Sequence, residues 1–188
     1  MTWWIRKQTN EEPLAVSLSS IKLGDRLLIV GSTDVPLIVA LATKAGLTGR
    51  TCMVDDRDAV TRHAAVEREG VLVEPFEAPF SALPFEAESF DVAVLRGVLK
   101  GLDAPKQSQL AAEAFRVLRP GGRCAVIEDE RRGGLAGLLT GGGGPAQSSS
   151  PRSYLEAVLS GAGFRGVRTI AERARVLFLE GVKAGVTG

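Results

Sequence analysis

The residues of this 188-residue chain that are best suited to bind a ligand lie in two polar segments, each directly after an apolar run. The first segment is Gly31-Ser32-Thr33-Asp34, and the second is the acid pair Asp55-Asp56. Glycine, serine and aspartate are typical of turns. A carboxylate at the end of a strand can accept hydrogen bonds from both hydroxyls of a ribose. The two segments therefore indicate a site for a ribose-containing ligand, with Asp55 as the acceptor.

A strand–helix–strand unit is needed to position these segments. Residues 27–30 and 51–54 are short apolar runs without alternation, as strands buried on both faces are. Between them, Asp34 can cap a helix that carries Pro36 in its first turn and ends at Gly46. Such a right-handed crossover places the carboxyl ends of its two parallel strands side by side, where open α/β sheets bind ligands.

The composition is that of an ordinary globular domain. Hydrophobic residues make up 45% and charged residues 24% of the chain, and the net charge of +1 gives no reason to expect nucleic acid as a partner. Two cysteines and one histidine show no metal-ligand spacing, so no metal is expected. No apolar stretch approaches the about 20 residues of a membrane span. The first residues do not read as a secretory signal, so a cytoplasmic location is expected.

The rest of the chain continues the alternation of strands and helices. Further strands are predicted over 71–74, 90–95, 124–128, 165–170 and 175–180, and further helices over 13–20, 57–69, 104–118 and 151–162. The Arg-Pro-Gly-Gly-Arg segment at 119–123 is expected to break the chain sharply after the helix that Asp103 can cap. The link between the last two strands is short, so they should be antiparallel neighbours.

Two segments differ from this regular pattern. Residues 1–20 are a lead-in, either a flap over the pocket or a segment that packs on the sheet edge, and residues 21–188 form the main domain. Within that domain, residues 131–150 are rich in glycine and serine, which predicts a flexible loop or lid.

Three motifs resemble those of a known family. Leu83–Ala93 reads L-P-F-E-A-E-S-F-D-V-A, Phe115–Arg123 reads F-R-V-L-R-P-G-G-R, and residues 162–164 read A-G-F. In these motifs the chain resembles the class I S-adenosylmethionine-dependent methyltransferases, and within them the small-molecule type that includes quinone-biosynthesis methyltransferases. The resemblance implies a Rossmann-like, doubly wound α/β fold. Its mostly parallel seven-stranded sheet would have the order 3-2-1-4-5-7-6, with helices on both faces.

The resemblance also implies S-adenosylmethionine as the cofactor, with candidate binding residues at the first two strand ends. The family's glycine motif follows the first strand, and of its three glycines this chain keeps Gly31. Ser32 and Thr33 complete the turn, and Asp34 is hypothesised to supply a carboxylate for the amino group of the cofactor. Asp55 matches the acid that binds the ribose, while Asp56 either assists it or only caps the next helix.

Further candidates follow the third and fourth strands. In the resemblance, Phe80 could pack on the adenine and Glu77 could reach its amino group, although loop aromatics more often belong to the core. Arg96 is a candidate for the cofactor or, with Lys100, for an anionic substrate, and the alternative is solvated charge. No general base is evident, since His63 lies on the helix after the second strand. Methyl transfer to a reactive nucleophile can depend on proximity and orientation alone.

These features leave two functions open and disfavour a third. The first is methyl transfer from S-adenosylmethionine to a small-molecule acceptor, and the second is a catalytically inactive scaffold or regulatory partner. A homodimer or a protein partner is compatible with both. A nicotinamide-dependent reductase is disfavoured, because no G-x-G-x-x-G follows the first strand and Tyr154 is followed four residues later by Val158 instead of lysine.

Overall fold

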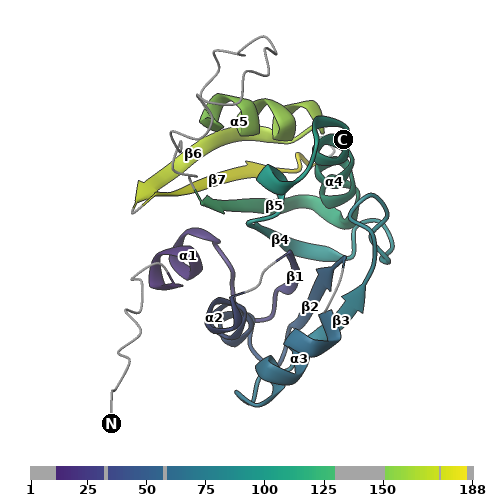
Figure 1. Cartoon of the computed structure of the whole chain (residues 1–188), viewed down its shortest axis with the longest axis vertical. Coiled ribbons are helices and arrows are strands. Elements are labelled where there is room, and N and C mark those ends of the chain that lie inside the picture. Colours follow the sequence, from purple (N-terminus) through teal and green to yellow (C-terminus); the bar gives the residue numbers. More distant parts are fainter. Residues whose placement is uncertain (1–11, 32–33, 57–58, 130–150, 174, 186–188) are drawn as a thin grey trace, which may run out of the picture.

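Seven strands form one mixed sheet in the computed structural model, which describes residues 12–31, 34–56, 59–129, 151–173 and 175–185. Their order is β3-β2-β1-β4-β5-β7-β6, which confirms the expected order (Figure 1). The first five are parallel, and β7 pairs antiparallel with both β5 and β6. The bounds are β1 Arg26–Val30, β2 Arg50–Asp55, β3 Glu74–Glu77, β4 Phe90–Arg96, β5 Leu118–Asp129, β6 Arg165–Arg173 and β7 Val176–Val182.

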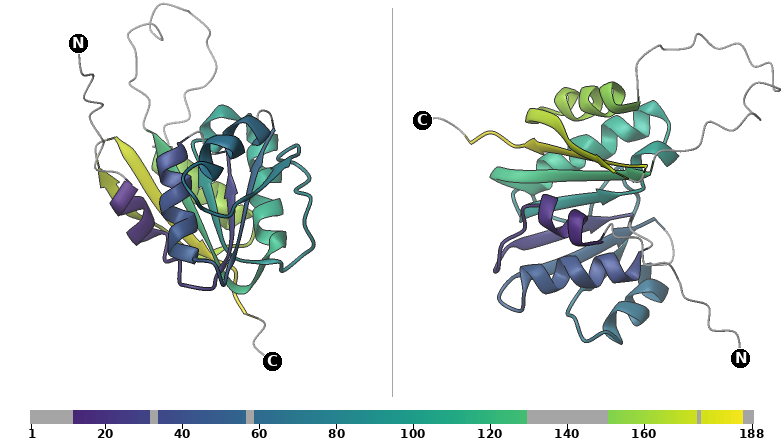
Figure 2. Two further views of the ribbon diagram at one scale, coloured as in Figure 1. Left: turned by 90° about the horizontal axis from the view of Figure 1, so that it is seen from below. Right: turned by 90° about the vertical axis from the view of Figure 1, so that its left-hand side faces the viewer.

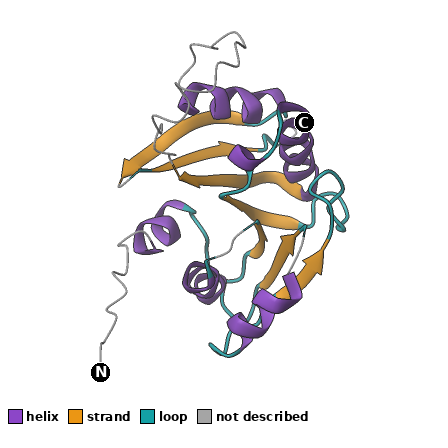
Figure 3. Cartoon of the chain, viewed as in Figure 1, coloured by secondary structure: helices purple, strands orange, loops and turns teal. Residues whose placement is uncertain are grey.

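Helices cover both faces of this sheet, as expected for a doubly wound fold (Figure 2). One apolar layer contains residues of α1, α2 and α3, and the other contains residues of the 3₁₀ helix η1, of α4 and of α5. Figure 3 shows the strands as one layer between these helices. The bounds are α1 Glu12–Leu18, α2 Val35–Ala45, α3 Ala59–Glu67, η1 Leu99–Gly101, α4 Ala104–Val117 and α5 Pro151–Gly161.

Two aspartates begin helices as the sequence predicts. The backbone amide of Leu37 donates to Oδ1 of Asp34 over 3.3 Å, and the amide of Lys106 donates to Oδ1 of Asp103 over 3.0 Å. Each helix also carries a proline in its first turn, where no intrahelical amide bond is lost. Gly46 is the C-cap of α2 at a φ of 72°. The caps therefore fix where the segment after β1 turns into a helix.

The third strand lies later in the chain than predicted. The apolar run 71–73 is not a strand, and β3 comprises Glu74–Glu77, including Pro75. A proline is tolerated there because β3 is an edge strand and its missing amide is not needed by a neighbour. The predicted strand over 71–74 was wrong because it ended before Pro75, which the edge position allows inside the strand.

The fifth strand is longer than predicted and includes the segment that was expected to break the chain. It begins at Leu118 and passes through Pro120, Gly121 and Gly122, with a register shift opposite the pair Phe90/Val92 of β4. Gly121 has a φ of 79°, which glycine adopts readily. The Pro-Gly-Gly segment therefore forms an irregularity within a strand, since β4 continues to pair across it.

The helix α1 covers a face of the sheet, so the expectation of an edge position was wrong. Ala15 is buried in the same apolar cluster as Ile127 of β5 and Phe178 of β7. Figure 1 shows α1 beside α2. The residues before α1, and the predicted loop at 131–150, lie outside the described residues. The described part of the lead-in therefore contributes to the core.

Candidate functional site

The carboxyl ends of the parallel strands bring most of the predicted site residues to one edge of the sheet. Val30, the last residue of β1, is in register with Val54 of β2 and Leu95 of β4. Asp55 is in register with Glu77 of β3. Gly31, Asp55, Glu77 and Arg96 therefore lie at or directly after neighbouring strand ends, which is the edge where this fold class binds ligands.

Gly31 occupies a position that suits only glycine. Its φ is 77°, and its amide donates to the Val54 carbonyl over 3.0 Å. A Cβ at this position would lie 2.7 Å from Cβ of Val98. The backbone therefore turns tightly at the end of β1 against the loop that follows β4. Ser32 and Thr33, the next two predicted residues, lie outside the described residues.

Asp34 is committed to starting α2. Besides capping that helix, it lines a cavity of about 10 Å³, together with Ala15, Arg96 and others. Such a volume is about that of one water molecule. The structure therefore places Asp34 near Arg96, beneath α1. Its carboxylate caps α2, in addition to any contact that it makes with a ligand.

Asp55 is the most enclosed acid among the predicted site residues. Only 7% of Asp55 is exposed, and its backbone carbonyl accepts a hydrogen bond from the amide of Ala78 over 3.0 Å. Asp56 and Glu77 are exposed. A carboxylate is buried at a strand end only where polar partners compensate for its lost hydration. The position and burial of Asp55 fit an acceptor for ligand hydroxyls.

Phe80 lies on the face of the sheet that carries α4 and α5. It is half-buried and packs against that apolar cluster, as Phe76 and Phe85 do. Glu77 follows Phe76 in β3, and successive side chains of a strand point to opposite faces. The two residues predicted to contact an adenine thus both lie near the end of β3 but on different faces of the sheet, and Phe80 is partly held by the core.

The two cations predicted after β4 both contact the end of β5. Arg96 donates to both carboxylate oxygens of Asp129, over 2.8 and 3.2 Å, and Lys100 Nζ donates to the Asp129 carbonyl over 3.0 Å. The guanidinium of Arg96 is largely shielded from solvent, whereas Asp129 is mostly exposed. An anionic ligand would therefore compete with Asp129, which the sequence reasoning did not single out.

The buried acid Glu128 was also not predicted from the sequence. It is 2% exposed, and its Oε1 accepts from the amide of Leu99 over 2.7 Å. Burial raises the pKa of Glu128, and the Leu99 amide and the cations Lys100 and Arg96 partly offset this. A signal was present, because Glu128 shares its strand face with the buried residues Cys124 and Val126.

The 3₁₀ helix η1 is held from a second side by α4 and α5. Gln107 Nε2 donates to the carbonyls of Leu99, over 2.8 Å, and Leu102, over 3.0 Å. The hydroxyl of Tyr154 donates to Oε1 of Gln107. Together with Glu128, these contacts fix the loop that follows β4 at the ligand-binding edge.

Two absences among the described residues bear on the class of site. None of their helices is long and apolar enough to cross a membrane. Among the same residues, no group of three or more His, Cys, Asp and Glu side chains is placed to hold a metal ion. Both cysteines, Cys52 and Cys124, are free and buried in strands, and burial raises the pKa of each thiol to about 12.

Known proteins with similar sequences are methyltransferases. Residues 28–126 match the family described as a methyltransferase domain. The sterol methyltransferase-like 1 protein of Botryococcus braunii is 32% identical over 125 residues, which cover 64% of this chain and 31% of that protein. A ubiquinone/menaquinone biosynthesis C-methyltransferase of Marinomonas is 26% identical, over 60% of this chain and 46% of the relative. The chain thus matches less than half the length of these curated relatives.

Solved structures share the fold at low identity. A SAM-dependent methyltransferase from Aquifex aeolicus superimposes with a TM-score of 0.73 at 18% identity, over 93% of this chain and 90% of that chain. The [4+2]-cyclase SpnF superimposes with a TM-score of 0.68 at 16% identity, over 93% and 80%. The fold therefore extends beyond methyl transfer. The family match spans more than half of the chain, and the protein belongs to the class I S-adenosylmethionine-dependent methyltransferases.

Proposed function

We propose that this protein transfers a methyl group from S-adenosylmethionine to a small-molecule acceptor. The observation that carries the proposal is the buried carboxylate of Asp55 at the end of β2, one strand from the tight turn at Gly31. The carboxylate provides an acceptor for the ribose hydroxyls of an adenosyl group, and the glycine turn lets the ligand approach the backbone closely. The residues present therefore fit the cofactor.

Each predicted residue has a role in this proposal. Asp55 accepts from the ribose hydroxyls, with Asp56 beside it, and Gly31 gives the backbone room to approach the methionine portion. Asp34 starts the helix that follows this turn, and Ser32 and Thr33 are candidate contacts of the same cofactor portion. Glu77 and Phe80 bind the adenine, by accepting from its amino group and by apolar contact, and Arg96 shapes the wall on the β4 side through its ion pair with Asp129.

The chemistry depends mainly on positioning. When bound, the cofactor supplies an electrophilic methyl group on a sulfonium. Glu128, the buried acid nearest the loop after β4, already accepts from the Leu99 amide and is thereby engaged in holding η1. The protein would accordingly act by holding a reactive nucleophile in line with the methyl group and by excluding water. Such a mechanism suits acceptors that are nucleophilic without a side-chain base.

The proposal extends to the acceptor class and to the compartment. The curated relatives carry names of sterol and of ubiquinone/menaquinone methyltransferases, so we propose a quinone-like or sterol-like apolar acceptor. Both cysteines are free thiols, which supports a reducing, cytoplasmic environment.

Calorimetric titration with S-adenosylhomocysteine tests the proposal. We expect micromolar binding to the wild-type protein and an affinity at least about tenfold lower for Asp55→Ala, because hydrogen bonds to a charged group are lost. Glu67→Ala, which removes an exposed acid from α3, is the control and should bind as the wild type does. Absence of binding at about 1 mM ligand would refute the proposal and favour the non-catalytic alternative.

A further inference from the structure

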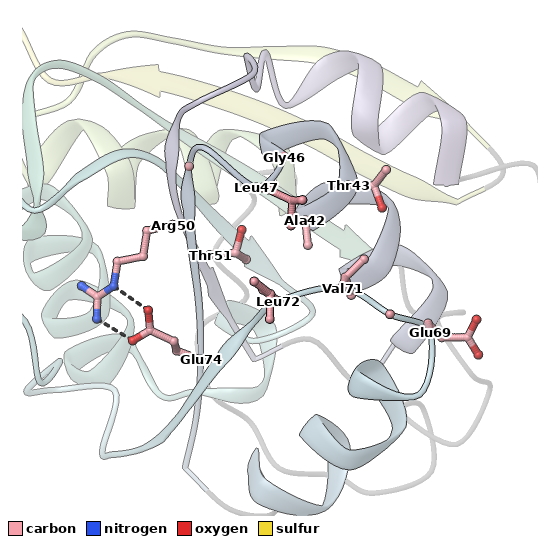
Figure 4. A pocket seen from close by; sticks show the side chains of 12 residues that line it. Ala42, Thr43, Gly46, Leu47, Arg50, Thr51, Glu69, Val71, Leu72 and Glu74 are labelled. Atoms are coloured by element: carbon pink, nitrogen blue, oxygen red, sulfur yellow. Dashed lines mark hydrogen bonds and ion pairs between the residues drawn. The ribbon is translucent and has the colours of Figure 1, made fainter.

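A pocket of about 470 Å³ lies at the opposite edge of the sheet, where β2 and β3 begin. Its walls come from the C-terminal end of α2, the start of β2 and the segment between α3 and β3 (Figure 4). Thr51, near the start of β2, lines this pocket, whereas Asp55 at the other end of the strand belongs to the methyltransferase site. The volume is in the range of small-molecule sites.

The walls are mainly apolar. Ala42 and Leu47 line one side, and Val71 and Leu72 line another (Figure 4). Leu47 is 81% exposed and Leu72 is 77% exposed, so both are among the most exposed large apolar side chains of the described chain. Exposed leucines that flank one concavity provide apolar surface which a ligand would remove from water.

One buried polar side chain that lines this pocket forms no hydrogen bond with another described residue. Thr51 is 6% exposed, and none of the described residues forms a hydrogen bond with its hydroxyl. Thr43 also lines the pocket, but its hydroxyl donates to the Val39 carbonyl over 2.7 Å. Figure 4 shows the Thr51 side chain between those of Arg50 and Leu72. Because an unpaired buried hydroxyl is unfavourable, Thr51 points to a polar atom supplied by a ligand.

The charges at the rim restrict what that ligand can be. Arg50 donates to both carboxylate oxygens of Glu74 over 2.8 and 2.7 Å, which leaves this pair neutral as a unit. Glu69 adds a second carboxylate to the lining. The net negative charge disfavours an anion, and the apolar walls disfavour a strongly hydrated group.

We propose that this pocket binds an uncharged amphipathic small molecule. Its apolar body would contact Leu47, Val71 and Leu72, and a hydroxyl or carbonyl would pair with the hydroxyl of Thr51. This site is separate from the methyltransferase site, so it does not depend on the function proposed above.

Methyl-resolved NMR titration with naphthol tests the proposal on the full chain, with S-adenosylhomocysteine present throughout to occupy the proposed cofactor site at the other edge. We expect naphthol to shift the methyl signals of Val71 and Leu72. Naphthoate, which has the same ring system and a negative charge, should bind much more weakly. Thr51→Val, which keeps the side-chain shape, should weaken naphthol binding about fivefold, whereas Thr43→Val should leave it unchanged. Leu72→Ser, at an exposed position that does not threaten folding, should also weaken binding.

Three results would overturn the proposal. The first is no shift of the Val71 and Leu72 signals at about 1 mM naphthol. The second is equal affinity for naphthoate, which would contradict the assigned ligand class. The third is equal weakening by Thr51→Val and Thr43→Val, which would remove the role given to the unpaired hydroxyl.

Discussion

The carboxylate of Asp91 accepts three hydrogen bonds from Arg26, from its backbone amide over 2.7 Å, from its Nε over 3.0 Å and from its Nη2 over 3.4 Å. Arg119 pairs with the same carboxylate. These three residues begin β4, β1 and β5, which are neighbours in the sheet. The aspartate of the S-F-D-V motif thus ties together the amino ends of three central strands.

Asp91→Asn should therefore destabilise the protein in a pH-dependent way. Burial acts to raise the pKa of Asp91, but the hydrogen bonds from Arg26 and Arg119 outweigh it and lower the pKa to about 2. This stabilisation is fully present above the unfolded pKa of 3.8 and is lost as the pH falls toward 2. We expect a loss of about 2 kcal/mol at neutral pH, measured by urea unfolding. A loss that stays constant down to acid pH would contradict the ion-pair explanation.

Glu128→Gln should have the opposite pH dependence. Because burial raises the pKa of Glu128, the folded protein keeps a proton that the unfolded chain releases, and stability falls as the pH rises above the unfolded value. The variant lacks this titration, so its stability relative to the wild type should increase with pH. Glu113→Gln is the matched control, since the hydrogen bond from Arg116 lowers the pKa of Glu113. If the free energy of unfolding in urea, relative to the wild type, changed with pH in the same direction for both variants, the raised pKa of Glu128 would be ruled out.

Gly31→Ala should be more destabilising than Gly97→Ala. Both glycines have positive φ, so both variants pay the backbone strain of about 1 kcal/mol. A Cβ at Gly31 also meets Val98 at 2.7 Å, whereas a Cβ at Gly97 meets nothing within 4 Å. We expect the clash to add about 1 kcal/mol or more in thermal or urea unfolding. Val98→Ala should not rescue the variant, because the atom in conflict is the Cβ of Val98 itself.

Tyr154→Phe should loosen the loop that follows β4. The substitution leaves Oε1 of the buried Gln107 without its donor, which should cost about 1–2 kcal/mol of stability. Gln107 holds the carbonyls of Leu99 and Leu102, so hydrogen exchange at the amides of η1 should accelerate. Unchanged exchange there, with a normal fold, would show that Tyr154 does not support η1.

Local patterns were sufficient to predict most of the helices and strands, whereas the sheet order followed from the family resemblance. The buried runs that became β1, β2 and β4, and the caps Asp34 and Asp103, are signals contained within a few residues. The errors arose where pairing with a distant strand decides the outcome. Pro75 lies in a strand because β2 aligns it beside Met53, and Gly121 lies in one because β4 pairs with β5 on both sides of it.

Part of the candidate site could also be predicted from local patterns, whereas other parts depend on contacts between distant segments. Asp55 and Gly31 stand directly after apolar runs, so chain position alone places them at the ligand-binding edge. Asp129 and the Glu128–Leu99 contact depend on how β5 lies against β4 and the loop after it. Thr51 could not be predicted as a binding residue, because only the packed structure reveals that it is buried at a pocket and that its hydroxyl bonds to none of the described residues.

The place of β7 between β5 and β6 has a consequence for the order in which the molecule assembles. During synthesis, β5 leaves the ribosome before β7 and has an unpaired edge until residues 176–182 follow. The sheet described here gives β6 no other strand neighbour than β7, so it also waits for them. A nascent chain therefore carries the open edge of β5 from the synthesis of Asp129 until that of Val182, and in this interval it is exposed to misassembly.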